Sequence, residues 1–130
     1  MSSKRKGDQR EREARHILED TDYTVETPNY TRFQNTDYFN LFDLMAFHPS
    51  RKPLFVQVKS NAARGIKQFV KDCAEIVPFE FVRVQFWVCY DSEGWRLIEI
   101  TEDGYTNIYD ERDTTHNMGE GAKEFLNSSE

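Results

Sequence analysis

Alternating hydrophobic and polar positions predict β-strands through the middle of the chain. The apolar residues of 43–47 and 54–59 flank a turn-forming segment, His48–Pro53, and this arrangement predicts a β-hairpin. Apolar residues alternate through 81–90, and Asp91–Gly94 then turns the chain into a further strand. The predicted strands span residues 23–26, 43–47, 54–59, 81–90 and 95–101.

Hydrophobic positions with a helical period lie on both sides of this hairpin. Residues 8–19 carry the apolar stripe Ala14, Ile17 and Leu18. Residues 62–77 carry a longer stripe that ends before a proline, which stops a helix. Strands and helices in this order predict an α/β fold, in which helices pack on a mixed β-sheet.

The length of 130 residues predicts a single domain with poorly structured ends. Residues 1–6 are basic and are expected to form a mobile arm. Residues 111–130 are expected to form a weakly structured acidic tail, with at most a weak helix over 120–126. The polar and aromatic segment 28–41 has no clear period and predicts a long loop, which in a compact domain is often functional.

Composition narrows the cellular setting of the protein. Two cysteines, Cys73 and Cys89, are too few for a disulfide framework and have no metal-ligand spacing. No apolar run approaches the roughly 20 residues of a membrane span, and no apolar stretch follows the basic N-terminus as in a secretory signal. We therefore expect a cytoplasmic protein with buried thiols and no membrane partner.

Charge is unevenly distributed along the chain, whose net charge is −6. Residues 1–71 hold 13 Lys and Arg against 9 Asp and Glu, whereas residues 72–130 hold 4 against 14. This asymmetry favours a polyanion-binding face on the first half. A solvated basic end beside a solvated acidic end is the alternative reading of charge alone.

Polar side chains interrupt the apolar hairpin at one end. Asp43 opens the first strand, and Gln57 and Lys59 close the second on one face, because side chains alternate along a strand. Pairing of the two strands brings Asp43 opposite residues 57–59. Glu11 flanks the apolar stripe of the first helix, so a helix packed on the sheet would aim it at this open end.

Two carboxylates, an amide oxygen and a backbone carbonyl form the hard, oxygen-rich site that Mg²⁺ or Mn²⁺ prefers. Such an ion polarises a phosphodiester and lowers the pKa of a bound water. A nearby lysine can orient or deprotonate that water and balance charge on the phosphate. The predicted chemistry is metal-assisted phosphodiester hydrolysis.

These residues carry a resemblance to known nucleases. Asp43, thirteen intervening residues and then Gln57-Val58-Lys59 resemble the D–x(n)–(E/Q)–x–K signature of the PD-(D/E)xK nuclease superfamily. Residues 6–12, KGDQRER, resemble the K-G-x-x-x-E-R helix start of the archaeal-type Holliday-junction resolvases. The resemblance extends over about residues 4–101 and implies a restriction-endonuclease-like mixed sheet of about five strands flanked by helices.

The resemblance also implies a function: a homodimeric endonuclease that cuts four-way DNA junctions with Mg²⁺, or with Mn²⁺ as a substitute. Glu11, Asp43 and Gln57 match the metal-binding positions, together with the backbone carbonyl of Val58, and Lys59 matches the catalytic lysine. Thr31 falls near the place of a functional serine of the family and could supply a hydroxyl. Gln57 stands where the family usually has Glu, so a negative charge is lost and weaker metal affinity is expected.

The basic residues predict contacts to DNA phosphates, with no sign of a helix that reads bases. Recognition is therefore expected to follow DNA shape and to weaken steeply with salt. The predicted DNA-binding residues are Lys4, Arg5, Lys6, Arg10, Arg32, Arg51, Lys52, Arg64 and Lys67.

Two other functions remain open at this point. One is a nuclease of the same fold that acts on another DNA structure, as a restriction-like or repair enzyme does. The other is a catalytically inactive DNA-binding dimer, which the Gln57 replacement favours. Taken singly, Lys59 could be a solvent-facing strand end, Asp43 a turn cap, and Glu11 half of a surface ion pair with Arg15.

Overall fold

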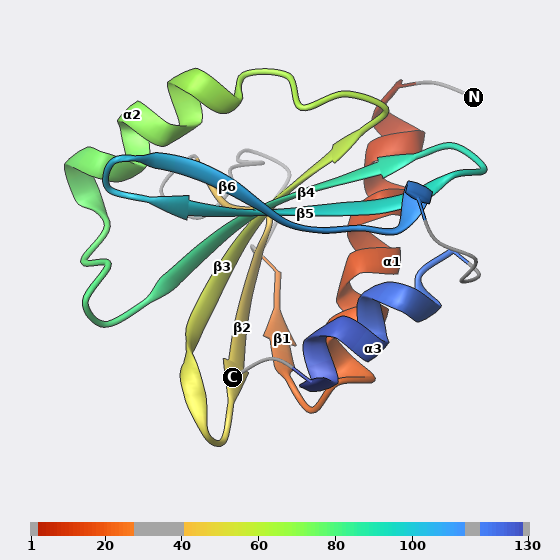
Figure 1. Ribbon diagram of the computed structural model, residues 1–130, viewed down its shortest axis with the longest axis horizontal. Coiled ribbons are helices and arrows are strands. Elements are labelled where there is room, and N and C mark those ends of the chain that lie inside the picture. Colours follow the sequence, from red (N-terminus) through yellow and green to blue (C-terminus); the bar gives the residue numbers. More distant parts are fainter. Residues whose placement is uncertain (1–2, 28–40, 114–117, 129–130) are drawn as a thin grey trace, which may run out of the picture.

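The computed structural model describes residues 3–27, 41–113 and 118–128, which form a six-stranded sheet with helices on both faces (Figure 1). The helices are α1 (Ser3–Glu19), α2 (Ile66–Ile76) and α3 (Glu120–Ser128), with a short 3-10 helix at Glu111–Asp113. The strands are β1 (Thr24–Glu26), β2 (Leu44–His48), β3 (Arg51–Ser60), β4 (Arg83–Tyr90), β5 (Gly94–Thr101) and β6 (Gly104–Asp110).

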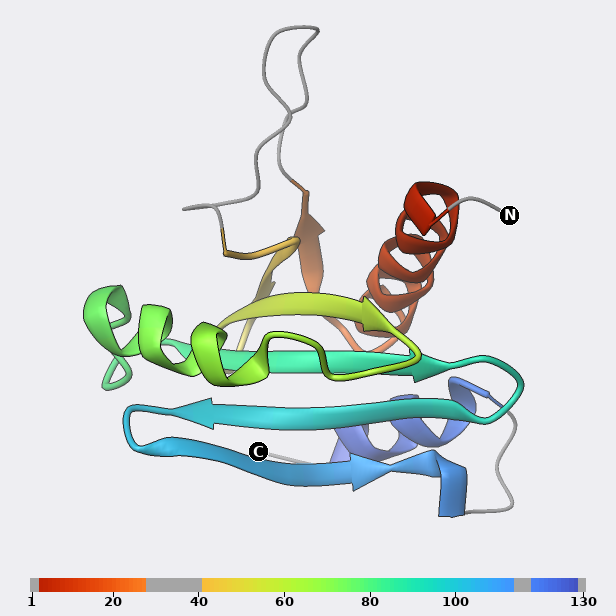
Figure 2. The ribbon, with the colours of Figure 1, turned by 90° about the horizontal axis from the view of Figure 1, so that it is seen from above.

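The strands lie in the sheet in their chain order, β1 to β6. Each neighbouring pair is antiparallel except β3 and β4, which are parallel and are connected through α2. The predicted α/β class and mixed sheet are therefore confirmed, with six strands in place of about five. The additional strand is β6, an edge strand that pairs with β5 (Figure 2). Its side chains are exposed or half-buried, so it has no apolar face to reveal it in the sequence.

Helices α1 and α3 cover one face of the sheet (Figure 1). The predicted stripe of Ala14, Ile17 and Leu18 is buried there, together with Trp87 and Trp95, which pack edge to face. The helix begins at Ser3, so most of the expected mobile arm over residues 1–6 is the first turn of α1. Lys6, in this turn, forms an ion pair with Asp91 of the β4–β5 turn, a partner far away along the chain.

The segment expected to be a weakly structured tail contributes to the core. Ala122 and Leu126 of α3 are buried against α1 and the sheet. The carboxylate of Glu111, itself 1% exposed, accepts hydrogen bonds from the N–H groups of Trp95 at 2.8 Å, Gly119 at 2.7 Å and Ala122 at 3.2 Å. This carboxylate thus fastens the start of α3 to β5, because the free N–H groups of a helix start attract an anion.

A glycine lies against this buried carboxylate. Gly94 has φ of 120°, and a Cβ placed there would lie 2.4 Å from Cγ of Glu111. The first residue of β5 must therefore lack a side chain for Glu111 to reach the backbone of Trp95.

Helix α2 covers the other face of the sheet. Ile66, Phe69 and Cys73 are buried against a cluster that includes Phe86 and Val88. The helix is shorter than the predicted span of 62–77 because the residue before it, Gly65, has φ of 75°, a left-handed conformation outside the helix.

Both cysteines behave as buried apolar residues. Cys73 and Cys89 are free thiols with 0% exposure, and burial raises the pKa of each to about 12. Within the described ranges, no helix is long and apolar enough to cross a membrane.

Candidate metal and nucleic-acid site

The Asp43 carboxylate lies against the backbone of β3. Asp43 directly precedes β2, and its N–H donates to the carbonyl of Val56 at 2.9 Å. Its Oδ2 accepts a hydrogen bond from the N–H of Val58 at 2.7 Å, and the residue is only 5% exposed. The predicted pairing, which returns residues 57–59 to Asp43, is present in the structure: Leu44 is in register with Val56.

Gln57 and Lys59 lie on one face of β3, as the alternation predicted. Val56 and Val58 point into the core under α1, so the residues between and after them point to the opposite face. Lys59 is partly exposed. The side-chain oxygen of Gln57 is buried and has no hydrogen-bond partner among the described residues. A buried acceptor without a partner is costly, so this oxygen, across the strand pair from Asp43, is one that a bound cation or water would satisfy.

The backbone carbonyl of Val58 lies on the side of β3 nearer Asp43. In an extended strand, the N–H and C=O of one residue point to the same side. Because the Val58 N–H meets the Asp43 carboxylate, the Val58 carbonyl opens toward the same edge. One strand edge therefore presents a carboxylate and a carbonyl oxygen.

Glu11 comes from the other face of the sheet. It lies on α1 one turn before the buried Ala14, and it is half-buried. Since α1 packs on the Val58 side of β3, Glu11 can meet Gln57 and Lys59 only around the end of that strand. The convergence of Glu11 with Asp43 therefore stays a prediction.

A polar cluster connects α1 to this end of the sheet. Lys6 and Arg10 of α1 both donate to the carboxylate of Asp91, in the turn after β4, each at 2.5 Å. Asn61, the residue after β3, also bonds to Asp91. The hydrogen bond from Lys6, joined by those from Asn61 and Arg10, holds the pKa of Asp91 well below its ordinary value. Sequence reasoning missed Asp91, which has the appearance of an ordinary turn residue.

Arg10 occupies a structural position in place of the predicted DNA contact. It is 6% exposed, and it pairs with Glu13 at 2.6 Å as well as with Asp91. A phosphate contact by Arg10 would have to break both pairs, so the expectation of an exposed phosphate ligand at this position is corrected.

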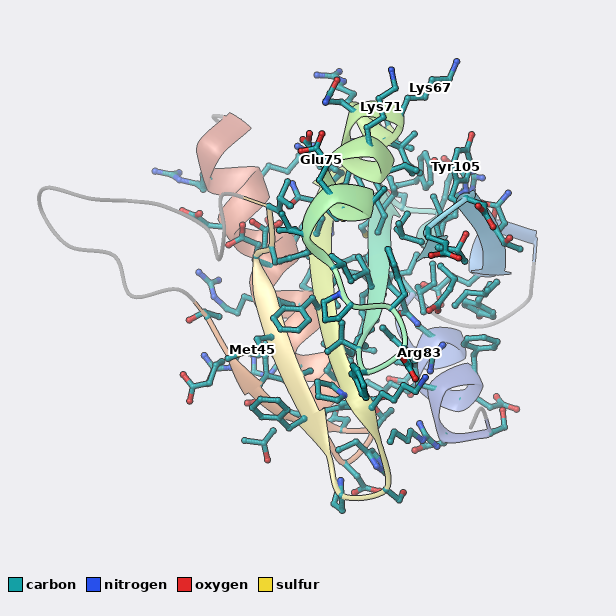
Figure 3. The ribbon with its side chains drawn as sticks, turned by 90° about the vertical axis from the view of Figure 1, so that its left-hand side faces the viewer. Met45, Lys67, Lys71, Glu75, Arg83 and Tyr105 are labelled. Atoms are coloured by element: carbon teal, nitrogen blue, oxygen red, sulfur yellow. The ribbon has the colours of Figure 1, made fainter. Side chains whose placement is uncertain are left out.

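The other predicted DNA-binding residues lie at several places on the surface. Arg5, Lys52, Arg64 and Lys67 are exposed, and Figure 3 shows Lys67 and Lys71 projecting from α2 away from the sheet. Arg51 lies at the start of β3 and donates to the carbonyl of Leu126 at 2.7 Å, which ties the hairpin to α3. Thr31, Arg32 and the side chain of Lys4 lie outside the described residues.

The predicted site comprises two carboxylates and an amide. Within residues 3–27, 41–113 and 118–128, no three His, Cys, Asp or Glu side chains form a group that could hold a metal ion. The predicted set has only two such side chains, Glu11 and Asp43, because Gln57 contributes a neutral oxygen. Any ion there would depend on amide and backbone oxygens as well as on acids.

Comparison with known proteins gives a likeness at the level of fold. The chain is similar to the structure of Hjc, a Holliday junction resolvase from the archaeal hyperthermophile Archaeoglobus fulgidus, with 20% sequence identity and a TM-score of 0.48, over 90% of this chain and 95% of that chain. No family model and no curated protein matches the chain. The roles of individual residues therefore rest on the geometry described above.

Proposed function

We propose that this chain is a metal-dependent endonuclease that hydrolyses phosphodiester bonds in branched DNA, with four-way junctions as its substrate. The observation that carries the proposal is the group at one end of β3. The buried Asp43 carboxylate, bonded to the Val58 N–H, lies across the strand pair from Gln57, and Lys59 follows on the same face as Gln57. The buried side-chain oxygen of Gln57 has no hydrogen-bond partner among the described residues.

These residues fit a hard divalent cation. The side-chain oxygen of Gln57 and the carbonyl of Val58 are neutral oxygen donors. Asp43 and Glu11 would add negative charge, and together these groups form a donor set that suits Mg²⁺ or Mn²⁺. When bound, the ion supplies polarisation of the phosphodiester and a more acidic water. A carboxylate has about four acceptor sites, so a hydrogen bond from Val58 does not by itself prevent Asp43 from serving as a ligand.

Lys59 acts on the water and the phosphate. As a cation at the end of the strand that carries Gln57, it orients the attacking water and offsets the charge that grows on the phosphate oxygens. Thr31 is proposed to add a hydroxyl to the site.

DNA is held through its phosphates in this account. The exposed Arg5, Lys52, Arg64 and Lys67 can contact backbone phosphates without reading bases, which suits recognition of a branched shape. A homodimer would bring two such sites to the opposing strands of a junction, whose symmetry demands paired cuts.

The direct test is a panel of labelled junction, flap, nicked and linear DNA, incubated with Mg²⁺ or with EDTA. We expect cleavage of the junction with Mg²⁺ and none with EDTA. Asp43→Asn and Lys59→Ala should each abolish cleavage while junction binding in a gel-shift assay persists. Asp103→Asn and Lys123→Ala, which make the same chemical changes on remote surface residues, serve as matched controls. Cutting by both site variants at the wild-type rate would refute the assignment.

Gln57 favours one second candidate, a DNA-binding dimer that has lost catalysis. A neutral residue at a ligand position lowers the affinity for a cation, and two acids alone hold one weakly in the absence of DNA. Calorimetric titration with Mn²⁺ separates the two functions. Heat of binding at millimolar metal or below supports the nuclease, and its absence together with intact junction binding supports the inactive module.

A further inference from the structure

The Asp91 carboxylate gathers partners from two segments that flank the candidate site. From α1 it accepts hydrogen bonds from Lys6 and Arg10. From the end of β3 it accepts one from the side-chain N–H of Asn61 at 3.1 Å, and its own backbone N–H donates to the Asn61 side-chain oxygen at 2.8 Å. Asp91 therefore links the helix that carries Glu11 with the strand that carries Gln57 and Lys59.

The β3 side of this link is firmly held. The backbone N–H of Asn61 donates to the carbonyl of Cys89 at 2.9 Å, which continues the β3–β4 pairing. Asn61 also has φ of 64°, the left-handed conformation that asparagine tolerates better than most residues. The strand end is thus anchored to the sheet, and α1 is the segment that the link positions.

The turns of α1 that precede the buried Ala14 contact the sheet end through Asp91. Arg10 is buried, its Nε has no hydrogen-bond partner among the described residues, and its guanidinium is shared between Glu13 and Asp91. Glu13 lies on the same helix, so this pair does not hold the helix to anything else. Asp91 is the partner that ties Arg10, and hence the neighbouring Glu11, to the sheet.

We propose that Asp91 is a positioning residue, which holds the first turns of α1 against the end of β3 and so places Glu11 at the metal site. This inference rests on the proposed function of that site. Asp91 also neutralises Lys6, so its removal frees a cation next to the site. The proposal therefore predicts opposite effects on the two activities: cleavage falls, whereas DNA binding is maintained or becomes tighter.

The test compares Asp91→Ala with Asp103→Ala in the full-length chain. Asp103 is an exposed carboxylate in the β5–β6 turn, so both variants make the same change in net charge. Single-turnover cleavage of bound junction should fall about tenfold or more in Asp91→Ala, since charge-assisted bonds that orient a ligand are lost. Junction Kd should not weaken, Mn²⁺ affinity in calorimetry should fall, and Asp103→Ala should leave the cleavage rate and the Mn²⁺ affinity unchanged.

Amide hydrogen exchange distinguishes a failure of the positioning role of Asp91 from a failure of the proposed nuclease function. Amides in the first turns of α1 should exchange faster in Asp91→Ala than in Asp103→Ala, whether or not the protein cuts DNA. Unchanged exchange there, or faster exchange with an unchanged cleavage rate and metal affinity, would overturn the positioning role. A wild-type protein that cuts no DNA with Mg²⁺ and binds no Mn²⁺ would instead overturn the proposed function. If the alanine variant does not fold, Asp91→Asn replaces it in the test. Asparagine keeps the size of the side chain and one acceptor, so the same changes in cleavage rate, metal affinity and exchange are expected with smaller magnitude.

Discussion

Two buried carboxylates, Asp43 and Glu111, show how differently this fold uses an acid. Both are at most 5% exposed, and both accept backbone N–H groups. Glu111 accepts hydrogen bonds from three backbone N–H groups, one in β5 and two at the start of α3, and Gly94 lies against its side chain. Asp43 instead lies at a strand edge, beside an amide oxygen that has no hydrogen-bond partner among the described residues and a lysine on that amide's face.

The comparison teaches that burial alone does not identify a functional acid. A carboxylate that accepts hydrogen bonds from several backbone N–H groups stabilises the fold, because it satisfies donors that would otherwise be buried without a partner. A carboxylate next to an unsatisfied oxygen leaves room for a ligand or an ordered water. This difference assigns Glu111 to the framework and supports the proposal that Asp43 belongs to a metal site.

Replacement of each acid by its amide should give the largest effects of the predicted experiments, on stability for Glu111 and on cleavage for Asp43. Glu111→Gln should lower the free energy of unfolding by about 2 kcal/mol or more, because an amide nitrogen would face backbone N–H groups. The folded fraction should still cut DNA. Asp43→Asn should do the reverse, with cleavage lost and a smaller change in stability. Denaturant melts and single-turnover cleavage measure the two outcomes, and similar losses of stability in both variants would remove the distinction.

A negative charge at position 57 should strengthen cation binding near Asp43 without affecting the framework around Glu111. Gln57→Glu adds one negative charge beside Asp43, so Mn²⁺ should bind about tenfold more tightly, with a modest gain or no change in cleavage at saturating Mg²⁺. Calorimetry on the wild type and the variant measures the difference. Gln68→Glu is the control, since Gln68 is an exposed residue of α2 and makes the same change in charge. Equal effects of the two changes on metal affinity would argue against a ligand role for Gln57.

The smallest predicted effect is the contribution of the two buried thiols to the free energy of unfolding, which depends on pH. An unfolded cysteine titrates near 9.0, whereas burial raises the pKa of Cys73 and Cys89 to about 12. Their contribution to stability is therefore fully present below pH 9.0 and is lost as the pH rises from there through about 12. Denaturant melts of wild type and of Cys73→Ala between pH 8 and 11 should show a shallower decline in the variant, and parallel declines would contradict this.

Much of the site could be predicted from the sequence because its pattern is local. Alternation along β3 places Gln57 and Lys59 on one face, and the short hairpin returns Asp43 to them. The hydrogen bonds of Lys6 and Arg10 with Asp91 could not be predicted, since their partner lies 85 and 81 residues away along the chain. Strand β6 was missed for another reason: an edge strand with mostly exposed side chains has no hydrophobic period.

The proposed function depends most on whether Glu11 and Asp43 bind one cation. Glu11 lies on a helix that covers one face of the sheet, whereas Asp43 lies within the sheet, where β2 pairs with β3. Anomalous diffraction from crystals soaked in Mn²⁺ measures this directly. We expect a single strong manganese peak about 2.0–2.4 Å from oxygens of Asp43, Gln57 and Glu11. A peak elsewhere, or a Glu11 carboxylate directed away from Asp43 in the soaked crystal, would contradict it.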